Sequence, residues 1–334
     1  MKKWFQLLVL AMIGVLVLAA CGTDSDDASG KDDGDGKTYK IGVSQYVEHP
    51  SLDRAYEGFQ KAIEDAGIKA ELEFNSAQGD QNNVKPISDN LVADHVDLIF
   101  ANATPSALGA KQATTDIPIV FTSVTDAVGA ELVSAMDEPG ENITGVIDLH
   151  PDAIKETVNF IDKYFSGVTV GLIYNAGEQN SVSQTDAVKT AAEGTSLKLV
   201  ERTVANSAEV HQAATTLVGE ADVFYIVTDN TVVSALESVV SVANEQDIPL
   251  FVGEPDSLEK GGFATFGIDY FTIGYRTGEM AVEILSGEKT TKDIPVEIPP
   301  EIQLFINKQA AEEQAVEWNE DWDQDAEFVE TAAE

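Results

Sequence analysis

The sequence predicts an α/β fold made of two doubly wound parallel-sheet lobes. Short strands alternate with amphipathic helices along most of the chain, which is the pattern of repeated βα units. Several strands, such as residues 96–101 and 118–122, are apolar at nearly every position, as in parallel sheets that helices cover on both faces. The βα units fall into two sets of similar length, which favours two lobes over a single eight-fold barrel.

Composition narrows the classes of function. The 334 residues give room for about two domains, and 43% of them are hydrophobic, so a sizeable core can form. Lys and Arg number 20 against 58 Asp and Glu, a net charge of −38. This balance, without any basic run, excludes nucleic-acid binding and adhesion to anionic lipid through a basic face. A single cysteine excludes an intrachain disulfide and a multi-cysteine zinc site.

The first residues predict a secretory signal peptide over residues 1–20. Lys2 and Lys3 precede an apolar run that is too short for a comfortable membrane span, and small residues follow it. Residues 18–21, Leu-Ala-Ala-Cys, resemble a bacterial lipobox, in which the cysteine is lipidated (diacylglyceryl, palmitate) and becomes the new N-terminus. We therefore expect Cys21 to be the lipidation site. The alternative is a plain signal peptide with an incidental cysteine.

Residues 21–38 are expected to form a flexible acidic tether. Between residues 22 and 37 the chain contains Gly, Ser, Asp and Lys but no large apolar side chain that would offset the entropy of ordering. The expected location is the outer face of the cell membrane, where a lipid rather than a membrane span holds the protein.

Apolar spacing assigns the elements of the first half. Residues 39–47 alternate and are rich in β-branched side chains, which is typical of a strand. Residues 52–66 repeat apolar side chains at helical spacing and end at Gly67, a residue common at helix C-termini. The elements expected next are a strand, a helix, a strand, a helix and a strand, over residues 70–75, 81–93, 96–101, 105–114 and 118–122.

The same alternation resumes after Asp148. Helices are expected over residues 152–164, 181–192, 208–218, 232–245 and 272–285. Strands are expected over residues 168–174, 197–204, 223–227, 249–252 and 263–268. The last stretch, residues 309–334, loses the pattern and is strongly acidic, so we expect a solvated tail or a frayed helix there. An interaction tail is the alternative.

Ligands of open α/β sheets bind beyond the carboxyl ends of the strands. In this sequence those ends are rich in hydroxyls, amides, carboxylates and aromatic rings and contain no Lys or Arg. The candidate ligand-binding residues are Gln45, Tyr46, Glu48, Thr104, Ser106, Ser123, Thr125, Asp126, Tyr174, Asn175, Ser181, Thr228, Asp229, Asn230 and Asp269. For any one of them, helix capping alone is the simpler interpretation.

The chemistry of these ends points to a zwitterionic α-amino acid. Residues 104–106 begin a helix, whose free N–H groups suit a carboxylate. The carboxylates of Asp229 and Asp269 suit an ammonium group. Three tyrosines stand at strand ends, where their rings would sandwich a flat side chain: Tyr46, Tyr174 and Tyr270. The alternative is that these rings cover the rim of the cleft.

Motifs of catalysis and cofactor binding are missing. The sequence has no Walker A motif, no G-x-G-x-x-G and no G-x-S-x-G. The four histidines, at positions 49, 95, 150 and 211, form no H-x-x-x-H pair. We therefore expect no cofactor, no metal site and no enzymatic activity.

Taken in order, several segments resemble a known family: the ABC-importer substrate-binding lipoproteins of the tryptophan/tyrosine-binding type. The resemblance covers roughly residues 40–308, beside the lipobox and the Asp-rich tether. Its segments are residues 41–53 (IGVSQYVEHPSLD), 75–81, 103–106, 118–126 (PIVFTSVTD), 142–146, 172–175, 228–230 and 267–270.

The resemblance implies a type I periplasmic-binding fold with three crossovers between the lobes, near residues 147–148, 268–270 and 289–294. Lobe 1 is then residues 39–147 plus 270–289. Lobe 2 is residues 148–269 plus 290–308. One departure is Glu254, where the family pattern suggests a smaller residue, so the wall of lobe 2 is expected to differ there.

The function implied is capture of a small zwitterion, an aromatic amino acid, between the lobes and its delivery to an ABC permease, by a protein expected to be monomeric. A sensory lipoprotein that presents an amino acid, nucleoside or sugar to a receptor is the alternative. A surface-anchored enzyme lacks its motifs. A lac-repressor-like regulator would need a helix-turn-helix where this chain has its signal peptide.

Overall fold

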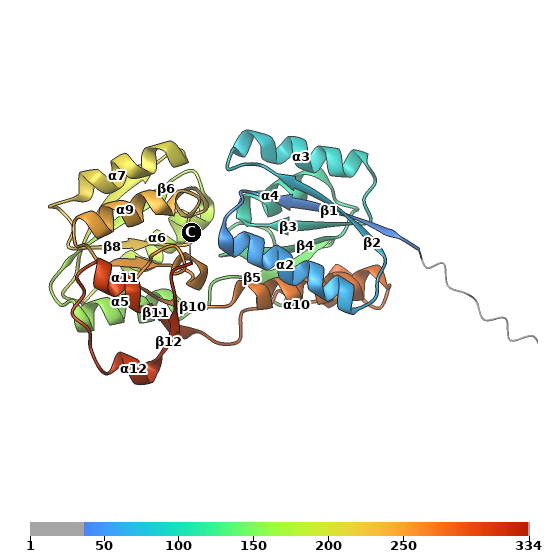
Figure 1. Ribbon diagram of the computed structural model, residues 1–334. Coiled ribbons are helices and arrows are strands. Elements are labelled where there is room, and N and C mark those ends of the chain that lie inside the picture. The colour runs from blue at the N-terminus through green and yellow to red at the C-terminus, as the bar shows by residue number, and fades with distance from the viewer. Residues whose placement is uncertain (1–36, 333–334) are drawn as a thin grey trace, which may run out of the picture. The chain divides into compact units, whose positions relative to one another are not determined.

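The computed structural model describes residues 37–332. The predicted signal peptide, the lipidation site Cys21 and nearly all of the predicted tether lie outside the described residues. From Thr38 onward the chain forms one compact unit with two separate sheets (Figure 1). Within residues 37–332, no helix combines the length and the apolar character needed to cross a membrane.

The first sheet has five parallel strands in the order β2-β1-β3-β4-β5. Its strands are β1 (Tyr39–Gln45), β2 (Ala70–Ser76), β3 (Leu98–Asn102), β4 (Ile119–Val124) and β5 (Ile143–Ile147). Its helices are α2 (Pro50–Asp65), α3 (Gln81–Ala93), α4 (Thr104–Ala113) and α10 (Tyr270–Leu285). Every residue of β3, β4 and β5 is buried, as their apolar sequences predict.

Helix α10 packs against α2 although more than 200 residues separate them in the chain (Figure 1). Two glycines make the close approach possible. A Cβ at Gly274 would collide with the backbone of Ala55, and one at Gly58 with the backbone of Phe271. These glycines therefore allow α10 to pack closely on α2. Through α10 the chain returns to the first lobe after it has formed most of the second.

The second sheet has seven strands in the order β12-β11-β10-β9-β8-β6-β7. Its strands are β6 (Thr169–Asn175), β7 (Lys198–Val204), β8 (Val223–Ile226), β9 (Leu250–Val252), β10 (Ala264–Gly267), β11 (Gln303–Asn307) and β12 (Ala326–Val329). All pairs are parallel except β10 with β11. Its helices are α5 (Ala153–Tyr164), α6 (Gln179–Ala192), α7 (Val210–Leu217), α8 (Asn230–Val233), α9 (Leu236–Glu245), α11 (Lys308–Glu313) and α12 (Trp322–Asp325).

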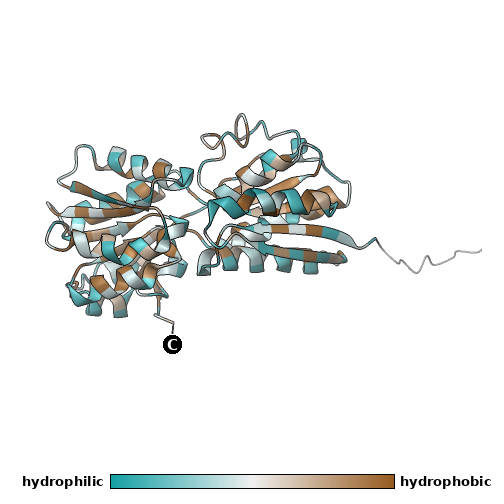
Figure 2. Cartoon of the chain, turned by 90° about the horizontal axis from the view of Figure 1, so that it is seen from above, coloured by the Kyte–Doolittle hydropathy of each residue, from teal (hydrophilic) through white to brown (hydrophobic). Residues whose placement is uncertain are grey.

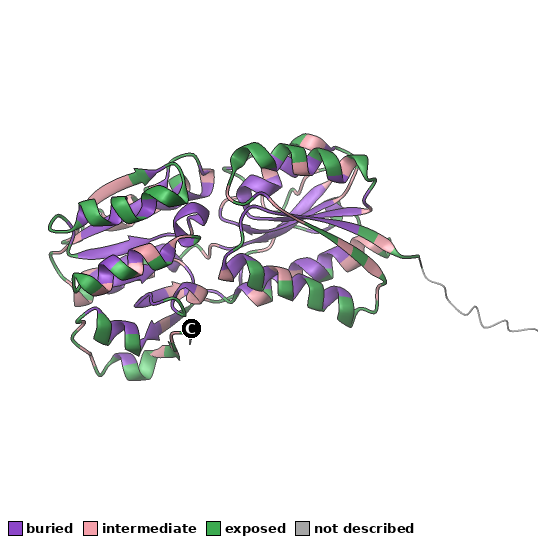
Figure 3. Cartoon of the chain, turned by 45° about the horizontal axis from the view of Figure 1, so that its top comes forward, coloured by how far each residue is buried: buried purple, intermediate pink, exposed green. Residues whose placement is uncertain are grey.

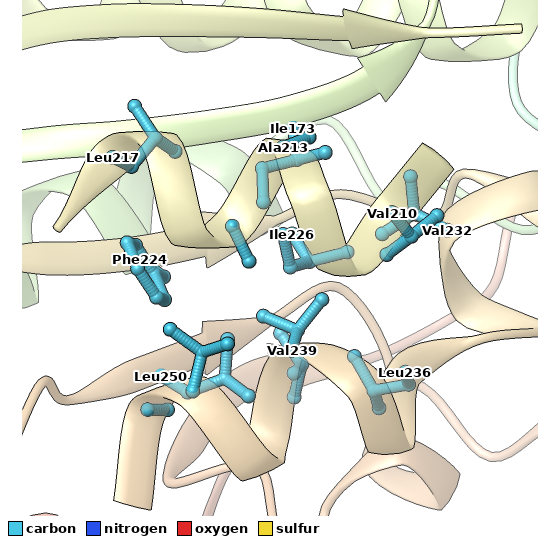
Figure 4. Close-up of a cluster of buried hydrophobic side chains, with 14 of the residues drawn as sticks. Ile173, Val210, Ala213, Leu217, Phe224, Ile226, Val232, Leu236, Val239 and Leu250 are labelled. Atoms are coloured by element: carbon cyan, nitrogen blue, oxygen red, sulfur yellow. The ribbon is translucent and has the colours of Figure 1, made fainter. Parts of the chain in front are cut away.

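Apolar layers hold the helices on both faces of the second sheet. On one face, α7 and α9 pack on β8 and β9 through Leu217, Phe224, Val239 and Leu250, among others (Figure 4). On the other face, aromatic rings dominate, including Phe160, Phe251, Phe263 and Trp322. The strands are buried while the outward faces of the helices are exposed and more polar (Figures 2 and 3).

The predicted fold class, two doubly wound parallel-sheet lobes, is confirmed. Several elements differ from the prediction. The helix expected over residues 232–245 is two helices, α8 and α9, because Ala235 between them leaves helical geometry, with φ −123° and ψ 23°. Strands β5 and β11 were not predicted, although residues of β5 formed part of the family resemblance.

The third crossover lies later than residues 289–294. Residues 294–297 still belong to the first lobe: the Ile294 carbonyl accepts a hydrogen bond from Thr144 Oγ1 at 2.6 Å, and the Glu297 amide donates to Gly145 O at 3.0 Å. Arg276 of α10 holds Glu297 through two hydrogen bonds of 2.8 and 2.9 Å. This ion pair and the backbone bonds extend lobe 1 beyond the predicted boundary at residue 289.

Residues 309–332 are not a solvated tail. Strand β12 pairs with β11 at the edge of the second sheet, and Trp322 is buried beneath it. Trp322 contacts the rings of Phe160 and Phe263, at centroid distances of 5.5 and 5.6 Å. The acidic residues of this segment face solvent. Because they dominate its composition, the sequence pattern did not indicate the strand, whose apolar contacts are few but specific.

Candidate functional site

Residues from both lobes and from the crossovers line a tight cavity of about 10 Å³, room for about one water molecule. It lies beyond the carboxyl ends of the strands, where the fold predicts a ligand. None of its lining residues is a lysine or an arginine. The lining residues are His49, Leu52, Ser123, Asp148, Asn180, Thr228, Asn230, Val233, Glu254 and Tyr270.

Hydrogen bonds cross the cleft between the lobes. Gln184 of α6 donates through Nε2 to Thr125 Oγ1, at 2.9 Å. His49, which precedes α2, lies with Nε2 3.5 Å from Asn230 Oδ1 at the start of α8. Burial lowers the pKa of His49 to about 4, so its ring is neutral at physiological pH.

The first lobe presents the start of α4 to the cleft. Ala103, just before the helix, has φ 88° and ψ 155°, a conformation that a residue with a Cβ rarely adopts. No side chain caps the helix, and Pro105 stands in its first turn. Such strain costs about 1–3 kcal/mol and is characteristic of ligand sites. Ser123, at the end of β4, also has a positive φ, 56°.

Several buried polar atoms around the cleft have no hydrogen-bond partner among residues 37–332. In native proteins nearly all such atoms are paired, because an unpaired one costs about 1–3 kcal/mol. Here they come from both lobes and include hydroxyls, an amide oxygen, a ring nitrogen and a carboxylate. They are His49 Nδ1, Thr104 Oγ1, Ser106 Oγ, Ser123 Oγ, Asn180 Oδ1 and Glu254 Oε2.

Two carboxyl groups line the cavity itself. Asp148, at the first crossover, accepts hydrogen bonds from Tyr270 OH at 2.8 Å and Thr125 Oγ1 at 3.3 Å. Burial raises its pKa to about 6. Glu254, which follows β9, accepts from Ser257 Oγ through one oxygen only. Burial, followed by the charge of Asp256, raises the pKa of Glu254 to about 8.

The predicted site residues divide into groups in the structure. Ser123, Thr228 and Asn230 line the cavity. Thr104, Ser106 and Thr125 are buried near it. The hydroxyls of Thr104 and Ser106 have no partner among the described residues, and Thr125 accepts the hydrogen bond from Gln184. Tyr46 and Asn175 line a larger pocket of about 820 Å³ that spans both lobes, and Asp269 lines another of about 670 Å³. The rest make contacts within their own lobe or face solvent; they are Gln45, Glu48, Asp126, Tyr174, Ser181 and Asp229.

Gln45 and Asn175 shape the loops beside the site. Gln45 donates to Val47 O at 3.0 Å and to Asp53 Oδ1 at 2.7 Å. Asn175 donates to Thr231 Oγ1 at 2.9 Å. Glu48 and Asp269 are exposed, and Asp126 closes a turn at Gly129. None of these residues lines the tight cavity between the lobes.

Asp229 makes its contacts within the second lobe and does not line the cavity. Its oxygens accept backbone N–H bonds from Asn175 at 2.6 Å and Val232 at 2.7 Å, and it also bonds Ser181. Burial, with the nearby charge of Glu178, raises its pKa to about 7. Asp229 is thus the N-cap of α8 and ties that helix to β6.

The three tyrosine rings that were expected to sandwich a ligand do not line one common cavity. Tyr46 donates to Gly79 O at 3.0 Å inside the first lobe. Tyr174 donates to Glu201 Oε2 at 3.0 Å on the neighbouring strand. Only Tyr270 of the three lines the cavity. Strand register decides which side chains of β1 and β6 point toward the cleft. The position of a residue near a strand end does not reveal this.

Sequence reasoning missed several functional groups. His49, Asp148, Asn180 and Glu254 line the cavity but were not among the candidates. Glu178, buried behind them, was missed too: it accepts bonds from Asn230 Nδ2 at 2.6 Å and Thr231 Oγ1 at 2.6 Å and so orients the start of α8. A signal existed for Glu254, which departed from the family pattern. Within residues 37–332, no group of three or more His, Cys, Asp and Glu residues is placed to hold a metal ion.

Comparison with known families settles the class of protein. Residues 40–329 match the family described as "ABC transporter substrate binding protein". The chain belongs to this family. Proteins of this family bind small molecules, and the cleft between the two lobes is the candidate place for the ligand.

Three similar proteins bear on the ligand. A curated "Tyrosine-binding protein" of Clostridioides difficile (strain R20291) is 42% identical over 316 residues, covering 92% of this chain and 90% of the relative. The crystal structure of an ABC domain in complex with L-Trp from Streptococcus pneumonia is 33% identical, with a TM-score of 0.83, covering 88% of this substrate-binding protein and 100% of that chain. The ligand-free, open structure of a substrate-binding protein with adhesive properties from Clostridium difficile is 37% identical, with a TM-score of 0.64 and the same coverage.

Proposed function

We propose that this substrate-binding protein captures an aromatic α-amino acid between its lobes and delivers it to the permease of an ABC importer, without altering it chemically. The observation that carries the proposal is the closed cavity whose buried polar atoms lack partners on both sides. A ligand with several hydrogen-bonding groups satisfies those atoms, which the protein alone leaves unpaired.

The carboxylate of the ligand is assigned to the start of α4. The uncapped N-terminus of this ten-residue helix offers free N–H groups and the positive end of its dipole. Thr104, Ser106 and Ser123 add buried hydroxyls that have no other partner in the described chain. An anion is held there without a basic side chain.

The opposite charge of the ligand is assigned to the acidic side of the cavity. Asp148 and Glu254 line it, and no Lys or Arg competes for them there. Phosphate and sulfate esters are unsuitable ligands because this wall would repel them. The ligand therefore has an anionic end and a cationic end, as an α-amino acid does.

The aromatic side chain is supported by the relatives rather than by a ring sandwich. One relative is a tyrosine-binding protein at 42% identity, and a similar structure contains L-Trp. In this chain the apolar lining of the cavity is Leu52, Val233 and the ring of Tyr270. Because the cavity has room for about one water molecule, the lobes must separate before a planar side chain can lie against this ring.

Closure around the ligand is supported by the contacts between the lobes. The bonds from Gln184 to Thr125 and between His49 and Asn230 cannot form in an open cleft. The higher TM-score to the L-Trp complex than to the ligand-free, open structure agrees with a closed arrangement. Binding free energy then shifts the population toward this state.

The location on the outer face of the membrane rests on Cys21. If its lipobox is processed, Cys21→Ser gives a protein that is unlipidated, either released or held by its uncut signal peptide. Phase partitioning in detergent measures this directly. Unchanged partitioning of the variant would show that another feature anchors the protein.

A thermal-shift screen of the twenty amino acids, sugars and nucleosides tests the ligand class. Tyrosine or tryptophan at a hundred times its dissociation constant should stabilise the protein by about 2.7 kcal/mol. Small-angle scattering should show a smaller radius of gyration with ligand. A response only to a sugar or nucleoside would overturn the amino-acid assignment.

A further inference from the structure

We infer that Glu254 is the residue that selects ligands bearing an ammonium group, and that it exchanges a proton for that group when the cleft is occupied. This inference rests on the proposed function, binding of an α-amino acid. It replaces the role that sequence reasoning gave to Asp229.

The geometry singles out Glu254 among the buried acids. Asp229 uses its oxygens on two backbone amides and Ser181, and Asp148 accepts from Tyr270 and Thr125. Glu254 is 1% exposed and lines the cavity, yet its Oε2 atom has no partner in the described structure. An ammonium group is the ligand fragment that satisfies such an oxygen best.

The position of Glu254 is rigid enough to select a ligand. It follows the buried strand β9 by one residue, Gly253, and precedes a short turn of helix, residues 255–257, that begins with proline. Its other oxygen, Oε1, accepts a hydrogen bond from Ser257 within that turn. Hence the free oxygen is fixed toward the cavity rather than on a mobile loop.

Among residues 37–332, no cation compensates this carboxyl group. The titratable groups that face it from the surrounding elements are acidic, phenolic or, in the case of the neutral histidine, uncharged; they are His49, Asp148, Asp229, Asp256 and Tyr270. A carboxyl in that setting keeps its proton, in agreement with its pKa of about 8. The ligand ammonium reverses the balance, and the proton of Glu254 leaves to solvent.

Glu254→Gln tests this assignment, because glutamine keeps the shape and removes the charge. For the unaltered protein, calorimetry with L-tyrosine should show release of up to one proton and affinity that rises by about tenfold per pH unit from pH 6 toward pH 8. The variant should bind tyrosine on the order of a hundredfold more weakly, without this pH slope. A matched control is Glu259→Gln: this residue follows the same strand but is exposed and lies outside the cavity lining.

A second ligand separates selection from general damage. The analogue 3-(4-hydroxyphenyl)propionate is tyrosine without its amino group. The unaltered protein should prefer tyrosine strongly, whereas Glu254→Gln should bind the two ligands with nearly equal affinity. A merely structural role would weaken both ligands alike, and the circular dichroism and melting of the variant establish that it folds.

The outcomes distinguish the two levels of the proposal. If the unaltered protein binds no amino acid, the proposed function fails. If it binds tyrosine, but Glu254→Gln keeps the affinity, the pH slope and the preference over the desamino analogue, then the assignment to Glu254 is overturned and the proposed function stands.

Discussion

Gln184 of the second lobe donates a hydrogen bond to Thr125 of the first, with 2.9 Å between Nε2 and Oγ1. Thr125 in turn donates to Asp148 at the first crossover, 3.3 Å away. Gln184 is buried and also accepts the backbone N–H of Thr228. One side chain thus joins the wall of the cleft in one lobe to the hinge and the wall of the other.

Gln184→Ala should weaken ligand binding by favouring the open state. Loss of the buried bonds removes about 1–2 kcal/mol from the closed form, equivalent to roughly 5- to 30-fold in the dissociation constant. Calorimetry measures the affinity, and small-angle scattering measures closure. Gln309→Ala is the control, because Gln309 is exposed and bonds only to Glu313 within its own helix. Equal affinity of both variants would show that this bond does not hold the lobes together.

Asp229 and Asp269 offer a matched pair of helix caps. Each accepts a backbone N–H in the first turn of its helix, from Val232 at 2.7 Å and from Thr272 at 3.0 Å. Asp229 is buried and also bonds the Asn175 amide, whereas Asp269 is exposed. Asp229→Ala should therefore lower the free energy of unfolding by about 2–3 kcal/mol, and Asp269→Ala by about 0.5–1 kcal/mol.

Urea denaturation measures both losses. If Asp229→Ala unfolds like the unaltered protein but no longer responds to an amino acid, Asp229 is a ligand group after all. The sequence alone favoured that interpretation, because a carboxylate after a buried strand looks the same whether it faces the cleft or caps the next helix.

Local rules predicted much of this molecule. The alternation of apolar strands and amphipathic helices gave the two lobes, and the strand-end rule brought Ser123, Thr228 and Asn230 to the cavity. What the sequence concealed depends on contacts between distant residues. The free oxygen of Glu254 is recognised only when its neighbours are known, and β12 is a strand only because β11 offers it an edge.

The pH dependence of stability follows from the raised pKa values of the buried acids. Glu254, ordinarily near 4.5, has a pKa of about 8 in the folded chain, and Asp229, ordinarily near 3.8, has one of about 7. A raised folded-state pKa gives stability that is complete below the unfolded pKa and is lost as the pH rises through the folded value. The ligand-free protein should therefore lose stability between about pH 6.5 and pH 8.

His49 acts in the opposite direction at lower pH. Its folded-state pKa of about 4 lies below its ordinary 6.5, so its contribution is lost as the pH falls below 6.5. Chemical denaturation at pH 6.5, 7 and 8 isolates the acids from this effect. Glu254→Gln should be more stable than the unaltered protein at pH 8 and should show a flatter profile. A variant less stable at pH 8 would contradict the uncompensated burial of Glu254.

Trp322 tests whether the acidic C-terminal segment is part of the fold. Its ring is 2% exposed and contacts Phe160, Tyr164, Phe263 and Trp318 at centroid distances of 5.2–5.6 Å. Trp322→Ala removes these contacts and leaves a cavity, so the free energy of unfolding should fall by about 3–5 kcal/mol.

The control for Trp322 is Phe328→Ala in the same segment. Phe328 lies on β12 and is 40% exposed, so its replacement creates no buried cavity and should cost far less. Denaturant titrations of the two variants give the comparison. Unfolding is monitored by circular dichroism, a signal that does not depend on the tryptophan that one variant lacks. If both variants unfold like the unaltered protein, residues 309–332 contribute nothing to stability and behave as the solvated tail that their composition predicted. A large loss of stability confined to Trp322→Ala would instead show that this segment covers the aromatic face of the second sheet, because the Trp322 indole contacts the rings of that face.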